Sequence, residues 1–210
     1  MGTGKSGRVD ALRRADLASD ALEQFRRWFQ EAQEKSGLVH PNAVCLSTVD
    51  PEGWPEGRIV LLKGVDAGGF IFYTNFRSAK ALALDRTPRG ALTFHWEALR
   101  RQVRVRGSVE TVDDATADAY FESRPRGSQL GAWASEQSEP ISDRKVLEDR
   151  AREVGERFAG QPVPRPPHWG GYRVVPRKVE FWQEGPDRLH DRFLYAGSPK
   201  GGWTITRLSP

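Results

Sequence analysis

The segment from Arg124 to Ser138 concentrates side chains that bind anions. It reads Arg-Pro-Arg-Gly-Ser-Gln-Leu-Gly-Ala-Trp-Ala-Ser-Glu-Gln-Ser. An arginine guanidinium matches the oxygens of a phosphate, and serine hydroxyls add further hydrogen-bond donors. Gly127 and Gly131 allow close approach of the backbone. The mixture predicts a wall that binds a flat, phosphorylated ligand, although composition alone fits an arginine-rich surface loop equally well.

Two pairs of polar residues have spacings that bring their side chains together. Tyr120 lies four residues before Arg124, one helical turn, so both can face one ligand; the alternative for Tyr120 is an aromatic core position. Arg188 and His190 lie two residues apart in a segment, 180–192, that combines aromatic residues with Arg and His. In a strand both would project from one side, and Leu189 would point into the core.

Other motifs carry less weight. Gly2-Thr3-Gly4-Lys5-Ser6-Gly7 formally satisfies a dinucleotide-binding pattern, but that pattern needs a preceding strand, for which there is no room. The four histidines, at 40, 95, 168 and 190, are scattered without Cys or carboxylate at ligand spacing, so we expect no metal site. No nucleophile elbow is present.

Length, charge and cysteine content limit the classes of protein that the chain can belong to. The 210 residues fit one domain, with a core, and the net charge is only +4. The sequence has no dense block of basic residues, so it gives no indication of a nucleic-acid partner. The single cysteine, Cys45, lies in an apolar run, where we expect a core residue, and it excludes a disulfide within the chain. No signal peptide or membrane span is evident, so we expect a cytoplasmic protein.

Apolar spacing predicts the elements that position these residues. Residues 1–18 lack apolar periodicity and predict a flexible lead, followed by a single domain over 19–210. A helix capped by Asp20 would present Leu22, Phe25, Trp28 and Phe29 on one face. Further helices are predicted over 79–85, 114–122 and 142–158. Strands are predicted over 43–49, 58–65, 69–74, 90–96, 102–112, 171–175, 178–183, 191–195 and 203–208. This order predicts an α+β fold, mainly antiparallel, with a β-barrel and flanking helices.

The two polar segments resemble the pyridoxine/pyridoxamine 5′-phosphate oxidase family. The resemblance extends to Arg58–Lys63, Phe72–Asn75, Arg101–Val103, Trp169–Gly171 and Arg207–Pro210. These motifs occur in the family's order and at close to its spacing from about residue 20 to the end, which is far more specific than any single motif. The resemblance implies an FMN-binding split barrel that forms a homodimer.

An FMN site is implied by this resemblance. It places Arg58 and Lys80 at the FMN phosphate, where a helix N-terminus adds backbone amides, and Gln102 at the flavin ring. Without the resemblance, ordinary surface charge is the better explanation for Arg58 and Lys80. The other implied FMN positions, some of them expected from the second subunit, are Ile59, Val60, Leu61, Leu62, Lys63, Tyr73, Thr74, Gln137, Ser138, Trp182 and Arg192.

A substrate site is implied as well, because two phosphates need two cationic clusters. Lys63, Tyr120, Arg124 and Ser128 would hold the substrate phosphate. Arg188 and His190 would lie over the pyridine ring as catalytic residues, and His190 could move a proton. The implied reaction oxidises pyridoxamine or pyridoxine 5′-phosphate to pyridoxal 5′-phosphate, with O₂ as electron acceptor and hydrogen peroxide as product.

The chain departs from the family at two places. Many members carry an arginine where this chain has Ala79, so one FMN phosphate contact is missing. The lead before residue 20 offers Arg13 and Arg14 but no tyrosine, which argues against a lid over the substrate.

Two other functions remain open from the sequence. The first is a related flavin enzyme of the phenazine-pathway type, against which the intact run from Arg124 to Ser128 argues. The second is a protein that binds FMN or pyridoxal phosphate without turnover, against which Arg188 and His190 argue together.

Overall fold

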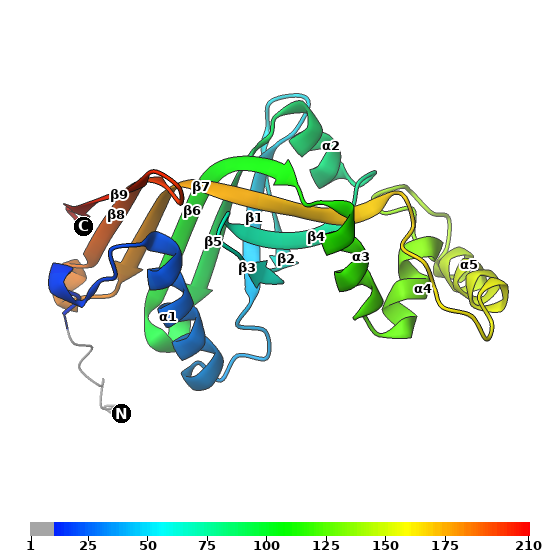
Figure 1. Cartoon of the computed structure of the whole chain (residues 1–210), viewed down its shortest axis with the longest axis horizontal. Helices are drawn as coiled ribbons and strands as arrows, with labels where there is room; N and C mark the ends of the chain where they lie inside the picture. Colours follow the sequence, from blue (N-terminus) through cyan, green and yellow to red (C-terminus); the bar gives the residue numbers. More distant parts are fainter. Residues whose placement is uncertain (1–10) are drawn as a thin grey trace.

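Nine antiparallel strands form one curled sheet in the part of the chain that the structure describes, residues 11–210 of a computed structural model (Figure 1). The strand order is β2-β1-β5-β6-β7-β4-β3, and β8 and β9 continue from β7. The glycine-rich motif at residues 2–7 lies outside the described residues. The strands are β1 (Ala43–Val49), β2 (Pro55–Leu61), β3 (Gly64–Val65), β4 (Phe70–Asn75), β5 (Arg89–Trp96), β6 (Arg101–Thr111), β7 (Trp169–Gln183), β8 (Asp191–Ser198) and β9 (Gly202–Leu208).

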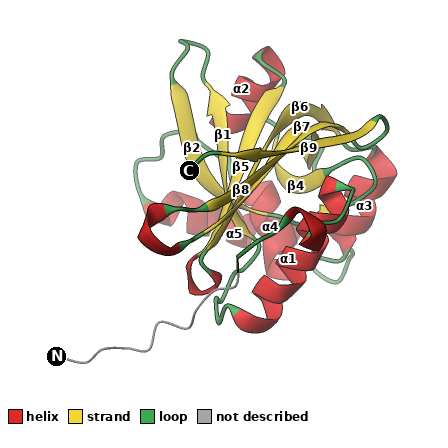
Figure 2. Cartoon of the chain, turned by 90° about the vertical axis from the view of Figure 1, so that its left-hand side faces the viewer, coloured by secondary structure: helices red, strands yellow, loops and turns green. Residues whose placement is uncertain are grey.

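Five α-helices flank the sheet. α3, α4 and α5 gather at one end of the molecule, whereas α1 lies against the sheet nearer the other end (Figures 1 and 2). The Asp20 carboxylate accepts a hydrogen bond from the amide of Glu23 and caps α1, as predicted. The helices are α1 (Ala21–Lys35), α2 (Ala79–Arg86), α3 (Asp114–Glu122), α4 (Arg126–Ala134) and α5 (Arg144–Arg157), with 3₁₀ turns at Arg14–Asp16, Glu97–Leu99 and Pro186–Arg188. Sequence patterns predicted all of them except α4 and the 3₁₀ turns.

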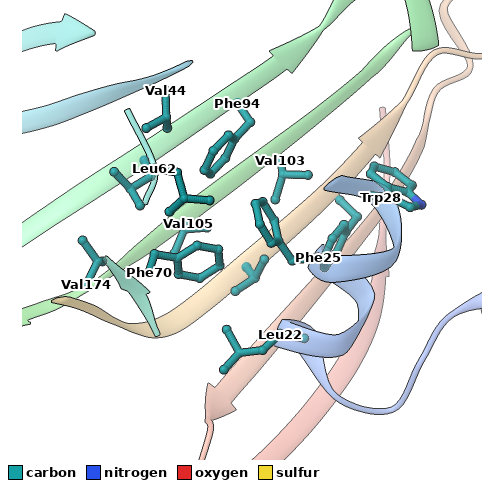
Figure 3. Packing of buried hydrophobic residues seen from close by; sticks show 14 of the residues in the cluster. Leu22, Phe25, Trp28, Val44, Leu62, Phe70, Phe94, Val103, Val105 and Val174 are labelled. Carbon is teal, nitrogen blue, oxygen red and sulfur yellow. The ribbon is translucent and has the colours of Figure 1, made fainter. Parts of the chain in front are cut away.

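The main core lies between α1 and the sheet. Leu22, Phe25 and Trp28 of α1 are buried against side chains from β4, β5, β6 and β7 (Figure 3). Phe25 meets Phe70 edge-on, with ring centres 4.8 Å apart. This apolar face is the one that the helical spacing predicted, and its burial fixes α1 on the sheet.

Two predicted strands, 171–175 and 178–183, are in fact one, β7, which runs unbroken through Pro176. A proline lacks the amide that a central strand needs. The structure accommodates it with a register shift in β6 between Arg106 and Gly107, opposite Pro176. A side chain at Gly107 would collide with the carbonyl of Val175, so the bulge requires glycine. The predicted strand 58–65, by contrast, divides into β2 and β3.

Residues 11–18 pack onto the domain, so the prediction of a flexible lead is wrong for this part. Leu12 and Leu17 are buried. The amide of Leu12 donates to the Asp191 carboxylate (2.8 Å), which also accepts from Arg207 (2.7 Å). Arg207 donates in turn to the carbonyl of Leu12 (2.9 Å). Asp191 therefore joins the beginning of the described chain to its last strand.

Candidate functional site

A cleft of about 400 Å³ opens between β2, β4 and the helices α3 and α4. It brings together residues that are far apart in the sequence, including most of those predicted to bind the cofactor or the substrate phosphate. Its lining consists of Ile59, Val60, Leu61, Lys63, Tyr73, Thr74, Lys80, Tyr120, Arg124, Pro125, Ser128, Gln137 and Trp169.

Lys80 lines one end of the cleft, and Arg58 lies close to Lys80 but outside the lining. Arg58 is held by hydrogen bonds to the Thr48 hydroxyl (2.6 Å) and the Glu56 carboxylate (2.6 Å). The Lys80 ammonium donates to the hydroxyls of Thr74 and Ser78, and no acidic side chain of residues 11–210 pairs with it. Burial lowers the pKa of Lys80, and the charge of Arg58 lowers it further. Such a desolvated cation is suited to an anionic ligand.

The segment after α4 is hydrogen-bonded to the start of α2, close to Lys80. The side-chain oxygen of Gln137 accepts hydrogen bonds from the Thr74 hydroxyl (3.2 Å) and the Asn75 amide (3.4 Å). The Ser138 hydroxyl accepts from the amide of Ala79 (3.2 Å), the first residue of α2. Gln137 and Ser138 thus set the position of the helix that carries Lys80.

The other end of the cleft carries Arg124 and Lys63. The Nη1 atom of Arg124 is buried and has no hydrogen-bond partner within residues 11–210, and burial lowers the pKa of the guanidinium. Lys63 lies between β2 and β3 with an exposed side chain. A buried guanidinium nitrogen without a partner is costly, and an anion placed here would satisfy it.

A stack of aromatic rings also lines the cleft. Tyr73 and Tyr120 lie face to face, with ring centres 4.0 Å apart and planes 13° apart. Trp169 lies nearly parallel to Tyr73, with ring centres 5.3 Å apart. The sequence analysis assigned Trp169 no place in the site. The available signal was the tryptophan followed by two glycines in a strand, since such glycines permit close approach of neighbouring groups.

Six predicted FMN positions do not line the cleft: Arg58, Leu62 and Ser138 lie near it, whereas Gln102, Trp182 and Arg192 lie elsewhere. Leu62 points into the main core and is 4% exposed. Ser138 acts on α2 as described above. Both belong to segments whose neighbours line the cleft, and strand alternation explains why Leu62 faces inward between Leu61 and Lys63.

Five predicted residues gather at a second place, around the other end of β7. Gln102 of β6 pairs with Trp182 of β7, which pairs with Arg192 of β8. The His190 ring lies 4.7 Å from the Trp182 ring, and its Nδ1 accepts a hydrogen bond from the amide of Gly185. Arg188 lies in the adjacent 3₁₀ turn with an exposed side chain.

The structure corrects the expected geometry of Arg188 and His190. They precede β8 and lie in a turn where Asp187 and Arg188 adopt positive φ values of 54° and 62°. Leu189 does not point into the core; it is 68% exposed. The reason is local: Pro186 starts a 3₁₀ turn, and the chain becomes extended only at Asp191.

Trp169 of the cleft and Trp182 of this second group lie near opposite ends of β7, the long strand that crosses the sheet in Figure 1. Trp169, in the cleft, and Trp182, in the second group, are separated by thirteen residues of one strand, or about 40 Å along it. One chain therefore does not bring all the predicted site residues together.

No group of three or more His, Cys, Asp or Glu side chains is arranged to hold a metal ion within the described part of the chain. Over the same residues, no helix has both the length and the apolar character required to cross a membrane.

Comparison with known families matches almost the whole chain. Residues 29–158 match the family model described as pyridoxamine 5′-phosphate oxidase. Residues 169–210 match the pyridoxine 5′-phosphate oxidase C-terminal dimerisation region. This chain belongs to the pyridoxamine 5′-phosphate oxidase family. The sequence resemblance is thereby confirmed, and the second group of residues falls within the matched dimerisation region, apart from Gln102.

Relatives within this family are similar over nearly their full length. The pyridoxine/pyridoxamine 5′-phosphate oxidase 1 of Ralstonia nicotianae is 56% identical over 196 residues, which cover 93% of this chain and 92% of that protein. The pyridoxine/pyridoxamine 5′-phosphate oxidase of Rubrobacter xylanophilus is 53% identical and covers 94% of this chain and 92% of that protein.

Solved structures confirm the fold of this family member as a split barrel. PhzG from Burkholderia lata, solved with tetrahydrophenazine-1-carboxylic acid, superposes with a TM-score of 0.88 at 29% identity and covers 97% of this chain and all of that one. A pyridoxamine 5′-phosphate oxidase-related, FMN binding protein from Nostoc punctiforme has a TM-score of 0.72 at 20% identity, covering 89% of this chain and 97% of that one.

Proposed function

We propose that this protein is an FMN-dependent oxidase that converts pyridoxamine 5′-phosphate and pyridoxine 5′-phosphate to pyridoxal 5′-phosphate. The observation that supports it most directly is the aromatic-lined cleft with cations at two places, Lys80 with Arg58 close by and Lys63 with Arg124. FMN and the substrate each bring one phosphate. Two separate cationic places fit two phosphates bound at once.

The residues fit FMN at the first place. Lys80, desolvated and without an acidic partner among residues 11–210, would bind the FMN phosphate at the start of α2, and Arg58, which is paired with Glu56, would add positive charge beside it. Bound FMN would supply the two-electron redox chemistry. Thr74 and Gln137, already hydrogen-bonded to each other, would contribute polar groups to the same end of the cleft.

Arg124, Tyr120, Lys63 and Ser128 would bind the substrate phosphate at the second place and orient the pyridine ring. With pyridoxine 5′-phosphate, the primary alcohol loses two electrons and two protons to become the aldehyde, while O₂ takes up both and becomes hydrogen peroxide. With the amine, water replaces the nitrogen and ammonia is released. The single cysteine suits a reducing cytoplasm, where we propose that the reaction occurs.

A homodimer would complete this site. Arg188, His190, Gln102, Trp182 and Arg192 lie about 40 Å along β7 from the cleft of their own chain. The segment from 169 to 210 matches the family's dimerisation region. We propose that a second copy places its Arg188 and His190 over the substrate in this cleft, so that each site uses both chains.

Aerobic turnover tests the proposed reaction. Purified protein with FMN is given pyridoxine 5′-phosphate, and pyridoxal 5′-phosphate and hydrogen peroxide are measured together. The proposal expects equal amounts of both products. A protein that binds FMN and forms neither product would contradict it.

Mixing two inactive variants tests the shared site. Arg124→Ala removes the cleft cation, and Arg188→Ala removes the residue proposed to come from the partner. After random subunit exchange, half of the dimers are mixed, and each mixed dimer has one intact site, so about a quarter of wild-type activity should return. If activity stays at the level of the separate variants, the site is not shared.

The similarity to PhzG supports a second candidate, oxidation of a substrate without a phosphate. The unpartnered buried nitrogen of Arg124 favours a phosphate-bearing substrate instead. The two candidates are distinguished by comparing pyridoxine with its phosphate. If the protein is a pyridoxine 5′-phosphate oxidase, pyridoxine should be turned over far less efficiently than pyridoxine 5′-phosphate. If its natural substrate has no phosphate, the two should be turned over with similar efficiency.

A further inference from the structure

Arg124 is held in place by aromatic rings alone. Its guanidinium lies 4.6 Å from the ring centre of Trp169 and 5.4 Å from that of Phe121. Among residues 11–210 its side chain makes no hydrogen bond or ion pair, and Nη1 is buried. This arrangement differs from that of Arg165, which is also mostly buried but donates to the carboxylates of Asp114 and Asp118.

The difference matters for a ligand. A carboxylate that fixed Arg124 would neutralise its charge and occupy the donors that a phosphate needs. A ring face attracts the cation through its quadrupole and forms no hydrogen bond with its N–H groups. Trp169 therefore restricts the guanidinium without competing for the anion.

The backbone around Trp169 is fixed on both sides. Its amide donates to the carbonyl of Pro166 (3.0 Å), and its own carbonyl accepts from Arg165 (2.7 Å). Its ring also meets Phe121 edge-on at 5.0 Å and is 6% exposed in total. The ring is a rigid surface, because neither its backbone nor its packed face is free to move.

The same ring belongs to the stack that orients Tyr120. Tyr73 lies nearly parallel both to Trp169 and to Tyr120, and it fits there because Gly171 has no side chain. A Cβ atom at Gly171 would lie 2.7 Å from Cε1 of Tyr73. One short motif, Trp169-Gly170-Gly171, thus supports the two side chains proposed to meet the substrate phosphate.

We propose that Trp169 is a positioning residue, which holds the guanidinium of Arg124 and, through Tyr73, the ring of Tyr120 in place for the phosphate of the substrate. This inference rests on the proposed function. It assigns Trp169 to recognition of the phosphate and not to the redox step.

The test compares binding of pyridoxal 5′-phosphate and of pyridoxal to the FMN-loaded protein by equilibrium dialysis. The ratio of the two dissociation constants isolates recognition of the phosphate. The variants are Trp169→Leu, which removes the ring, and Trp169→Phe, which keeps a smaller one. Trp133→Leu is the matched control. The Arg157 guanidinium lies 5.1 Å from the centre of the Trp133 ring, and Trp133 does not line the cleft.

Trp169→Leu should reduce the preference for the phosphorylated ligand about tenfold, since a desolvated cation–π contact corresponds to roughly that factor. Trp169→Phe should reduce it about threefold, and Trp133→Leu should leave it unchanged. In turnover, KM for pyridoxine 5′-phosphate should rise with the same ratio while kcat stays within about threefold.

An unchanged preference in folded, FMN-loaded Trp169→Leu would overturn the inference. If that variant does not fold, Trp169→Phe decides, and an unchanged preference there has the same meaning. Wild-type protein that prefers the phosphorylated ligand but oxidises neither vitamer would contradict the proposed oxidation alone, because the variants would still report on Trp169. Wild-type protein without any preference would overturn both.

Discussion

The hydroxyl of Ser138 caps α2 from a distance of 59 residues, by accepting a hydrogen bond from the amide of Ala79 (3.2 Å). Ser78, the residue that precedes α2, does not cap it, because its own hydroxyl donates to the carbonyl of Asn75 (2.7 Å). Ser138 reaches Ala79 with a φ of 79°, in the left-handed region. Capping of the helix that carries Lys80 therefore depends on a strained residue from another part of the chain.

Two substitutions at Ser138 should distinguish the contribution of the helix cap to stability from the cost of the left-handed backbone. Ser138→Ala loses the cap and keeps the left-handed backbone, so the free energy of unfolding should fall by about 1 kcal/mol. Ser138→Gly also loses the cap but relieves a strain of about 1 kcal/mol, so it should stay close to wild type. Urea unfolding of the FMN-free protein measures both. If the glycine variant is the less stable one, the left-handed conformation is not strained.

Arg124→Ala should raise KM for pyridoxine 5′-phosphate by about tenfold to a hundredfold, because each charge-assisted hydrogen bond contributes about 1.5–3 kcal/mol. Arg126→Ala is the matched control. Its guanidinium donates to the carbonyls of Phe158 and Gln161, away from the cleft lining, so this variant should lose stability and keep its KM. Steady-state kinetics and thermal unfolding of both variants should therefore give opposite patterns. Equal KM values would remove Arg124 from the phosphate site.

Arg188→Ala should reduce turnover more than a hundredfold while the protein folds and binds FMN as before. Its side chain is exposed and makes no ion pair with any described residue, so the free energy of unfolding should change by less than about 0.5 kcal/mol. Arg144→Ala, at an exposed ion-paired position on α5, controls for loss of one positive charge. Full activity of Arg188→Ala would contradict its catalytic assignment.

FMN affinity should weaken at alkaline pH because of Lys80. Burial and the charge of Arg58 lower its pKa below the ordinary 10.5, so the ammonium loses its proton, and with it the attraction to phosphate, at a lower pH than an ordinary lysine. The dissociation constant of FMN, measured by flavin fluorescence from pH 7 to 10, should rise toward the upper end. Lys80→Arg keeps its charge throughout and should flatten the profile. A flat wild-type profile would argue against Lys80 as a phosphate ligand.

Gly171→Ala should destabilise the protein by about 1–3 kcal/mol, because its Cβ would lie 2.7 Å from both Tyr73 Cε1 and Val112 Cγ2 in a packed region. The displaced Tyr73 should also weaken binding of pyridoxal 5′-phosphate. Gly155→Ala on α5, where a Cβ meets nothing within 4 Å, is the control and should be neutral or stabilising. Thermal unfolding distinguishes the two variants.

Alternation and helical spacing were enough to predict most of the elements. The face of α1 with Leu22, Phe25 and Trp28 is buried as expected, and α3 spans the predicted residues. Helix α4 was missed because two glycines interrupt it and Pro125 precedes it without a side-chain cap. Pro176 concealed the continuity of β7, since the strand continues through it only with a shift of register against β6.

The site could be predicted only in part, for a geometric reason. Tyr120 and Arg124 share the cleft, although α3 ends at Glu122 and Arg124 does not lie one turn along the same helix, as their spacing had predicted. Arg188 and His190 lie in a turn that contains positive φ values, and no local sequence pattern predicted that turn. Trp182 lies a whole strand away from Trp169, and this separation is a property of sheet topology and not of spacing.

The Asp191 carboxylate binds both Leu12 and Arg207. We therefore expect the segment around Leu12 and strand β9 to unfold locally in one step. In hydrogen exchange the amide of Leu12 should become accessible together with those of β9, although Arg207 of β9 is 195 residues away in the sequence. His190 immediately precedes Asp191. Fraying at this corner of the molecule would therefore reach the turn that carries Arg188 before it disturbs the main core.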